Sequence, residues 1–153
     1  MSAMAQTLRA LFLLAALSPA LHAATPSDQQ QPVLAPIHAL FDGMAARDVA
    51  AIRTPLLPGG SLVLMREGKP IQMTFEAFAQ RVAQPGTTRI EERIHQPLVR
   101  IDHDLAVVWA PFDVLVDGKE DHCGTDLFSL VRQNGRWIIA SIADTGRKIC
   151  PAR

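Results

Sequence analysis

The sequence predicts a single α+β domain in which N-terminal helices pack on a curved antiparallel sheet formed by the C-terminal half. Apolar residues recur at helical spacing early in the domain, and the later segments alternate as strands do. Two dipeptides typical of tight hairpins, Asp117-Gly118 and Asn134-Gly135, connect the later segments. Helices that precede a run of antiparallel strands pack together on one face of the sheet, which is the α+β arrangement.

Three helices are expected in the first part of the domain. The first covers 37–46, where four apolar residues stand at helical spacing: Ile37, Leu40, Phe41 and Met44. A short second helix over 49–53 follows Asp48, a good N-cap, and a third over 75–82 follows Thr74.

A short hairpin and four long strands complete the predicted domain. The hairpin joins 61–65 to 70–73 through a turn that contains Gly68. The four long strands are expected at 87–101, 105–116, 119–132 and 136–147. With the helices on one face of this sheet, they complete the predicted α+β domain.

The first 23 residues have the composition of a secretory signal peptide. Arg9 supplies positive charge, 10–17 form an unbroken apolar run, and Leu21-His22-Ala23 ends in a small-residue cleavage site. A membrane anchor is the alternative, but the apolar run is well short of the roughly 20 residues that span a bilayer. We therefore expect cleavage near Ala23.

Cleavage would leave a flexible lead-in over 24–35 and one domain over 36–150. Later apolar runs are interrupted by charge, Gly or Pro, so we expect no membrane span after cleavage and a periplasmic or secreted location. One of the 15 basic residues lies in the signal peptide, so 14 Lys and Arg balance 15 Asp and Glu in the mature chain. A near-neutral chain lacks the basic surface that nucleic acid requires, and no nucleic-acid partner is expected.

Both cysteines, Cys123 and Cys150, lie in the mature chain. In an oxidising compartment an even pair favours a disulfide, with free thiols or a metal pair as alternatives. Two cysteines cannot complete a zinc site alone, and the sequence contains no Cys-x-x-Cys motif. A disulfide is therefore the prediction for this pair.

The two hairpin dipeptides also predict how residues pair across the sheet. If each is a two-residue loop, His122 lies opposite Asp113 and Asp126 lies opposite Trp109. A carboxylate beside an imidazole orients the ring and raises its pKa, as acid–base sites require. The alternatives are a buried polar cluster that determines strand pairing, or a salt bridge at the rim. A one-residue bulge would also turn His122 to the opposite face.

These pairings define the candidate site. The expected catalytic residues are His122 as the acid–base group, Asp113 as its orienting partner, and Asp126 as a polar contact or second acid. The expected ligand-binding residues are Trp109, His95 and Phe128. No nucleotide-binding glycine motif, nucleophile elbow or metal-ligand cluster occurs in the sequence, so neither a cofactor nor a metal is expected.

In this register both faces of the sheet are largely apolar. The helices can cover only one of them, and a second copy of the chain is the simplest cover for the other. A homodimer is therefore expected.

Three strings of the strand region carry a resemblance to a known family. They are Trp-Ala-Pro-Phe at 109–112, His-Cys-Gly-Thr-Asp at 122–126 and Gly-Arg-Trp-Ile-Ile at 135–139. With the order of helices and strands, they resemble the exported bacterial branch of the nuclear transport factor 2-like (NTF2-like) superfamily. The superfamily includes SnoaL-like and ketosteroid-isomerase-like proteins, and this branch is named for lumazine-binding-like proteins. The resemblance covers about 36–150.

The resemblance implies a cone with a pocket at its open end and dimers through the outer face of the sheet. It leaves the reaction open, because this fold hosts enzymes, binding proteins and scaffolds. The chain has Asp144-Thr145 where similar proteins carry a Tyr-Thr pair, and it contains no tyrosine. The ketosteroid-isomerase oxyanion hole, which uses a Tyr with a protonated Asp, therefore cannot be transferred here.

Three functions remain. The leading hypothesis is an exported protein that binds a small apolar or aromatic molecule, because an apolar pocket with a few polar groups is typical of small-ligand sites. The second is a small enzyme, isomerase- or dehydratase-like, that uses His122 and Asp113. The third is a structural or protein-interaction scaffold.

Overall fold

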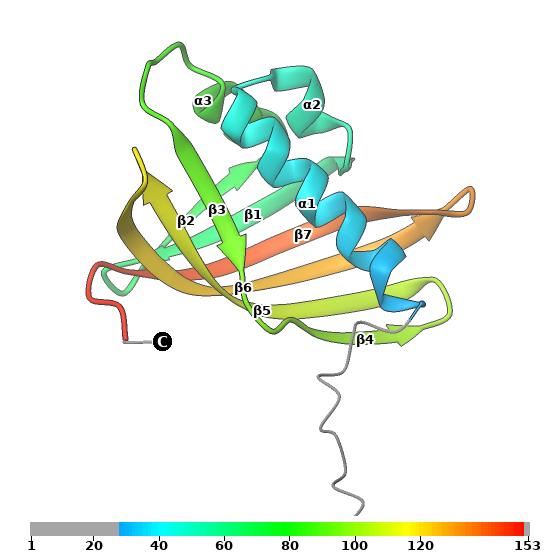
Figure 1. Ribbon diagram of the computed structural model, residues 1–153. Helices are drawn as coiled ribbons and strands as arrows, with labels where there is room; N and C mark the ends of the chain where they lie inside the picture. Colours follow the sequence, from blue (N-terminus) through cyan, green and yellow to red (C-terminus); the bar gives the residue numbers. More distant parts are fainter. Residues whose placement is uncertain (1–27, 152–153) are drawn as a thin grey trace, which may run out of the picture.

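The computed structural model describes residues 28–151, which form one α+β unit with helices packed on a curved sheet (Figure 1). The sheet has seven strands in the order β2-β1-β7-β6-β5-β3, and β4 also pairs with β5. The predicted fold class is confirmed. The expected signal peptide and the first part of the expected lead-in lie outside the described residues.

The three helices are α1 (Gln30–Ala46), α2 (Val49–Arg53) and α3 (Phe75–Val82). The caps of the short helices are those expected from the sequence. A side-chain oxygen of Asp48 accepts hydrogen bonds from the N–H groups that begin α2, at 2.8 and 3.1 Å. The hydroxyl of Thr74 accepts one from Ala77, at 3.1 Å, at the start of α3.

Helix α1 begins earlier than expected and takes in much of the segment predicted as a flexible lead-in. Pro36, which directly follows the predicted lead-in, lies inside the helix. It removes one main-chain hydrogen bond. Burial of Val33 and Leu34 against the sheet offsets that loss, because both side chains are almost fully removed from water.

The strands are β1 (Leu56–Arg66), β2 (Lys69–Thr74), β3 (Ile90–Ile94), β4 (Leu98–Asp102), β5 (Leu105–Val116), β6 (Lys119–Gln133) and β7 (Arg136–Arg147). The last three form the expected meander. Both of its hairpin turns have left-handed φ angles at two successive residues, 51° and 77° at Asp117-Gly118 and 50° and 77° at Asn134-Gly135. Two such residues are typical of a type I′ turn, which matches the twist of the strands.

Two strand predictions need correction. The expected strand over 87–101 is two strands, β3 and β4, which pair with different halves of β5. The break lies where Gln96 has a φ of 43° and Pro97 has no N–H to donate. In addition, β1 pairs in parallel with β7, so the sheet is mixed rather than wholly antiparallel.

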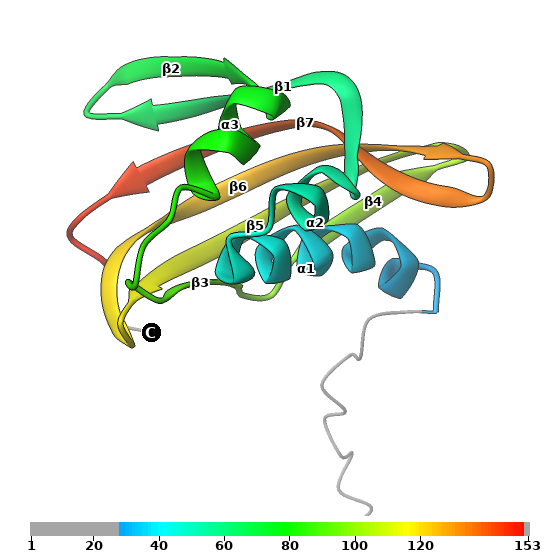
Figure 2. The ribbon, with the colours of Figure 1, turned by 90° about the horizontal axis from the view of Figure 1, so that it is seen from above.

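The core lies between the helices and the inner face of the sheet. Figure 2 shows the three helices on one side of the sheet, with the β1–β2 hairpin extending past them. Ile37 and Leu40 of α1 belong to the same buried cluster as Phe128 and Leu130 of β6. The outer face of the sheet has no covering element within the described residues, and several large apolar side chains are exposed there.

Candidate functional site

A cavity of about 290 Å³ lies between the helices and the inner face of the sheet. Its lining comes from α1, α3 and five of the strands, and most of it is apolar, including Phe41, Leu62 and Phe128. Phe41 and Phe128 meet edge to face, with ring centroids 6.2 Å apart. The site is therefore an apolar chamber built on rigid elements.

A cluster of charged side chains occupies one wall of the cavity. Four strands contribute to it: Arg66 from β1, Glu92 from β3, Asp126 from β6 and Asp144 from β7. Asp126 and Asp144 are directly paired across β6 and β7, so their side chains point the same way. The curvature of the sheet brings Glu92 and Arg66 to the same wall.

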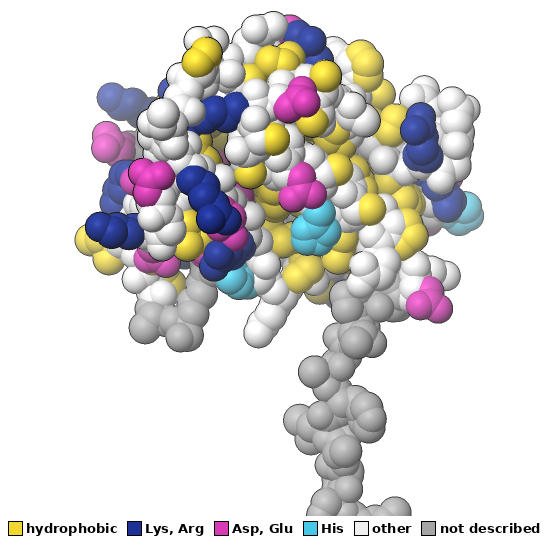
Figure 3. Space-filling view, turned by 45° about the horizontal axis from the view of Figure 1, so that its top comes forward, with side chains coloured by type: hydrophobic (Ala, Val, Ile, Leu, Met, Phe, Trp, Pro, Cys, Tyr) yellow, Lys and Arg dark blue, Asp and Glu magenta, His cyan; other side chains and the backbone are white. Residues whose placement is uncertain are grey.

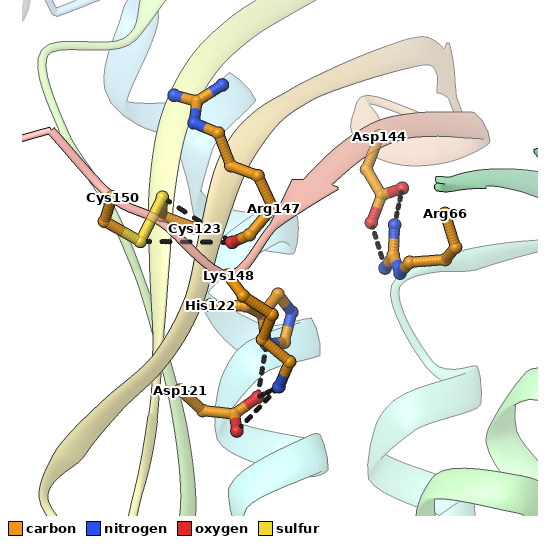
Figure 4. A network of polar contacts seen from close by, with 8 residues as sticks. All are labelled: Arg66, Asp121, His122, Cys123, Asp144, Arg147, Lys148 and Cys150. Carbon is orange, nitrogen blue, oxygen red and sulfur yellow. Dashed lines mark hydrogen bonds and ion pairs between the residues drawn. A yellow bond between two sulfur atoms is a disulfide. The ribbon is translucent and has the colours of Figure 1, made fainter. Parts of the chain in front are cut away.

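Both carboxylate oxygens of Asp144 accept hydrogen bonds within this cluster. The Arg66 guanidinium donates two parallel hydrogen bonds to its carboxylate, Nη1 to Oδ1 at 2.6 Å and Nη2 to Oδ2 at 2.7 Å (Figure 4). The main-chain N–H of Met65 donates a third, at 3.2 Å. Such a bidentate pair neutralises a buried carboxylate and holds it rigidly.

Glu92 and Asp126 form a different kind of pair, in which one carboxyl is hydrogen-bonded to the other. Two ionised carboxylates cannot share a hydrogen bond, so the pair holds a proton. The pKa of Glu92 is raised to about 7. Burial is the main cause, and the negative charges of Asp144 and Asp113 also raise it, while the hydrogen bond with Asp126 and the charge of Arg66 lower it.

Asp126 is the more buried member of the pair, with only 3% of its surface exposed. Burial and the charges of Glu92 and Asp144 raise its pKa well above the usual range. No N–H or hydroxyl group among the described residues donates to its Oδ2. The pair is therefore a proton-sharing acidic group that faces an apolar chamber.

His122 lines the cavity and also lines a second groove near the end of β7. Its Nδ1 lies 2.8 Å from Oδ2 of Asp121, and Lys148 Nζ lies 2.9 Å from both oxygens of that carboxylate (Figure 4). Lys148, followed by His122, lowers the pKa of Asp121. The ring packs edge to face against Phe112, with centroids 5.9 Å apart.

The expected pairing of His122 with Asp113, and of Asp126 with Trp109, is wrong. His122 pairs with Val114, and Asp126 pairs with Ala110. The register of β5 and β6 shifts after Val114, so one residue of β6 is extra there. Such a bulge shifts the pairing by one residue and reverses which face each side chain occupies.

The structure divides the six predicted site residues into two groups. His122, Asp126 and Phe128 line the cavity. Asp113 is on the opposite face of β5, where its Oδ1 contacts Nε2 of His95. Trp109 is also on the outer face and is 53% exposed. Trp109, Asp113 and His95 therefore cannot touch a ligand in this cavity.

The string at 122–126 has a clear structural role. Cys123 points outward and forms the predicted disulfide with Cys150, with Cα atoms 5.8 Å apart (Figure 4). Gly124 lets two neighbours approach closely, because a Cβ there would lie 1.6 Å from the carbonyl oxygen of Thr145 and 2.8 Å from the ring of Phe112. Any side chain at this position would push β7 or Phe112 away from the cavity wall.

A family model described as "Putative lumazine-binding" matches residues 28–143. The chain belongs to this family. No match is found among the curated proteins. The family agrees with the resemblance seen in the strand strings.

Solved structures share the NTF2-like fold. An NTF2-like protein from Cytophaga hutchinsonii has 17% identity and a TM-score of 0.66, covering 78% of this chain and 99% of that one. A Nostoc punctiforme protein with a cystatin-like fold has 12% identity and a TM-score of 0.67, covering 82% and 96%. A "putative dehydratase" of the NTF2-like family from Streptomyces avermitilis has 16% identity and a TM-score of 0.64, covering 80% and 99%. At such identities these likenesses show the fold alone.

Sequence reasoning missed three members of the charged cluster, Glu92, Asp144 and Arg66. Glu92 stands in a run of alternating charge, which is usually solvated, and Arg66 stands in a predicted turn. The available signal was the alternation itself, since Glu92 shares a strand face with Ile90 and Ile94. Within residues 28–151, no group of three or more His, Cys, Asp or Glu side chains is arranged to hold a metal ion. No helix in that range is long and apolar enough to cross a membrane.

Proposed function

We propose that this protein is exported and binds a small, largely apolar molecule in the cavity between its helices and sheet. The observation that carries the proposal is the 290 Å³ chamber, whose apolar walls surround one group of buried polar side chains. Small-ligand sites combine these two features, with the apolar surface supplying affinity and a few polar groups supplying orientation. The volume is near the lower end of the usual range of about 300–1,000 Å³, which favours a compact ligand.

The family description supports a heteroaromatic ligand, since lumazine is a flat bicyclic ring system. Aromatic side chains line the cavity at Phe41, Phe112 and Phe128, and such rings favour contact with another ring. Lumazine itself is the first compound to test.

Export is supported by two separate features. The signal-peptide pattern of the first 23 residues lies outside the described residues and is a prediction from sequence. The Cys123–Cys150 disulfide is compatible with an oxidising compartment.

We further propose that two copies associate through the outer face of the sheet. Large apolar side chains 38–53% exposed form one patch on three adjacent strands: Leu98, Leu105, Val107, Trp109 and Leu127. A self-complementary apolar face of this kind is what a two-fold interface buries.

The binding function is tested by filling the cavity. Val82, at the end of α3, lines the cavity, and Val82→Trp places a large ring in it. Ala77→Trp, on the exposed side of the same helix, is the matched control. We expect native mass spectrometry of gently isolated protein to find a bound small molecule in wild type and Ala77→Trp, but not in Val82→Trp.

The same proteins are then assayed for thermal shift with lumazine and a panel of small heteroaromatic compounds. Wild type should be stabilised by at least one of these compounds, and Val82→Trp by none. An empty wild-type protein that responds to no compound would overturn the proposed function.

An acid–base enzyme is the second candidate, and one observation favours it. Glu92, with a pKa of about 7, shares a proton with Asp126 inside the cavity. A carboxyl pair of this kind can give and take a proton at neutral pH. These two carboxyls therefore replace the predicted His122–Asp113 pair in the enzyme hypothesis. Recovery of a chemically altered ligand after incubation with wild type, but not with Glu92→Gln, would favour the enzyme over the binder.

A further inference from the structure

The cavity wall carries more acid than the protein itself neutralises. Three carboxyl groups face the cavity, those of Glu92, Asp126 and Asp144. Arg66 contacts Asp144 with both of its terminal nitrogens. It is therefore not free to bind the other two carboxyls, and it is not free to bind an anionic ligand.

Three other side chains that can carry positive charge line the cavity: Arg47, Arg81 and His122. Arg47, which follows α1, donates to three main-chain carbonyl oxygens at the rim, at 2.9–3.2 Å. Arg81 of α3 is exposed. His122 of β6 contacts Asp121 through Nδ1. Among the described residues, no ion pair joins any of these groups to Glu92 or Asp126.

One carboxyl oxygen of Asp126 has no hydrogen-bond donor among the described residues. Its side chain is 97% buried, because only 3% of the residue is exposed, and Oδ2 accepts no hydrogen bond from an N–H or hydroxyl group of the described residues. A buried carboxyl with an unused acceptor is costly unless a donor reaches it. The proton shared with Glu92 relieves this cost only in part, since two carboxyls offer four acceptor oxygens.

We propose that Glu92 and Asp126 bind the protonated nitrogen base of a small ligand whose remaining surface is apolar, with an amidine-like pair of adjacent N–H donors as the best fit. This inference rests on the proposed function, because it names the ligand class of the same cavity. The two carboxyls receive the N–H groups, and Phe112, Phe128 and neighbouring apolar side chains enclose the ring. Two parallel N–H donors match carboxylate oxygens in geometry and charge.

Binding of such a cation displaces the proton that the carboxyl pair holds. No covalent bond forms or breaks, and the proton passes to solvent. Affinity must therefore increase with pH until the pair is ionised, and one proton is released for each ligand bound below that pH.

Three compounds of nearly the same shape test the ligand class. Benzamidine carries the cation, benzamide is its neutral counterpart, and benzoate is the anion. By isothermal titration calorimetry at pH 8, we expect benzamidine to bind about tenfold or more tightly than benzamide, and benzoate not to bind. Between pH 8 and pH 6 benzamidine affinity should fall severalfold, and buffers of different ionisation enthalpy should report proton release at pH 6.

Two variants locate the effect. Glu92→Gln keeps the shape of the side chain and removes its charge, and it should abolish the preference for benzamidine over benzamide. Glu91→Gln makes the same change one residue earlier, where the carboxylate contacts Arg89 and Arg93 instead, and it should keep the preference. Asp126→Asn provides a second test of the pair. Melting temperatures show that each variant is folded.

The outcomes separate this inference from the proposed function. Equal binding of benzamidine and benzamide, or a preference for benzoate, would overturn the cation site and leave small-molecule binding intact. A neutral or anionic molecule found in the wild-type cavity by native mass spectrometry would do the same. If no probe binds and no molecule co-purifies, both proposals fail together.

Discussion

Glu92 and Asp126 determine, at the scale of single residues, how this protein responds to pH. The other buried acid, Asp144, is neutralised by Arg66 in the folded state. Within residues 28–151 no ion pair joins the carboxyl pair to a cation, and the raised pKa of both groups favours the protonated form. Charge balance in the cavity therefore depends on one proton, or on whatever cation replaces it.

The free energy of unfolding should depend on pH because of the proton held by Glu92 and Asp126. The pKa of Glu92 is about 7 in the folded protein against an ordinary value of 4.5, so the folded state holds the proton more tightly than the unfolded chain. The resulting stabilisation is complete below pH 4.5 and is lost as pH rises to about 7. In urea unfolding we expect the free energy of unfolding to fall across this range by on the order of 1–3 kcal/mol.

The variants used for ligand binding also serve here. Glu92→Gln removes one titrating group and the repulsion of Glu92 on Asp126, so the fall in stability should become smaller, while burial of Asp126 still contributes to it. Glu91→Gln should retain it. A wild-type protein equally stable at both ends of the range, or a Glu92→Gln slope equal to that of wild type, would contradict the shared proton.

At the scale of elements, the end of β7 and the tail that follows it lie beside the cavity and form a second groove that shares Arg66 and His122 with it. Cys150 ties the tail to β6 through Cys123, and Lys148 contacts Asp121, which in turn contacts His122. Figure 3 shows Lys and Arg side chains gathered on the side where the described chain ends, with Asp and Glu between them. The disulfide therefore positions charged groups at the edge of the cavity.

Reduction of the disulfide should loosen this element. The bridge closes a loop with a sequence separation of 27, and the chain-entropy relation gives a stabilisation of about 3–4 kcal/mol for such a loop. We expect Cys150→Ser to lower the free energy of unfolding by this order. Wild type should lose a similar amount in reducing agent, while Cys150→Ser should be insensitive to reductant. Equal stability of the oxidised and reduced wild type would show that the tail contributes nothing.

Association of two copies belongs to the scale of the whole molecule. Trp109 and Leu127 are paired on adjacent strands of the outer face and are both exposed in the single chain. We expect light scattering at micromolar concentration to give a dimer for the mature protein. Trp109→Asp should give a monomer, because it places a charge at the centre of an apolar interface.

Ile149 provides the control for this experiment. It is 89% exposed but lies on the tail, away from the outer-face patch. Ile149→Asp should therefore remain a dimer. A monomeric wild-type protein would show that the outer face is stable without a second copy, and it would overturn the dimer proposal.

Local signals in the sequence were reliable where the structure depends on local chemistry. Asp48 and Thr74 cap their helices as expected, since a cap needs only its own side chain and the next few N–H groups. The predicted start of α1 is too late, because burial of Val33 and Leu34 offsets the hydrogen bond that Pro36 removes. Local propensity yields to tertiary packing in such cases.

The candidate site was predicted only in part. Asp126, His122 and Phe128 line the cavity, and the cross-strand partners predicted for Asp126 and His122 are wrong. A single bulge in β6 caused both errors, and a bulge leaves no clear mark in composition or spacing. Glu92 lies on the same cavity wall as Asp126 because the sheet curves. No local sequence pattern predicts this proximity.

The α+β class, the meander with its two tight turns and the Cys123–Cys150 pair follow from the sequence. The turns depend on Asp-Gly and Asn-Gly, the strands on alternation of apolar residues, and the disulfide on an even number of cysteines. The parallel pairing of β1 with β7, the register of β5 against β6 and the meeting of Glu92 with Asp126 depend on the folded molecule. A shift of one residue costs little locally but exchanges the two faces of a strand, so packing against the helices selects the register.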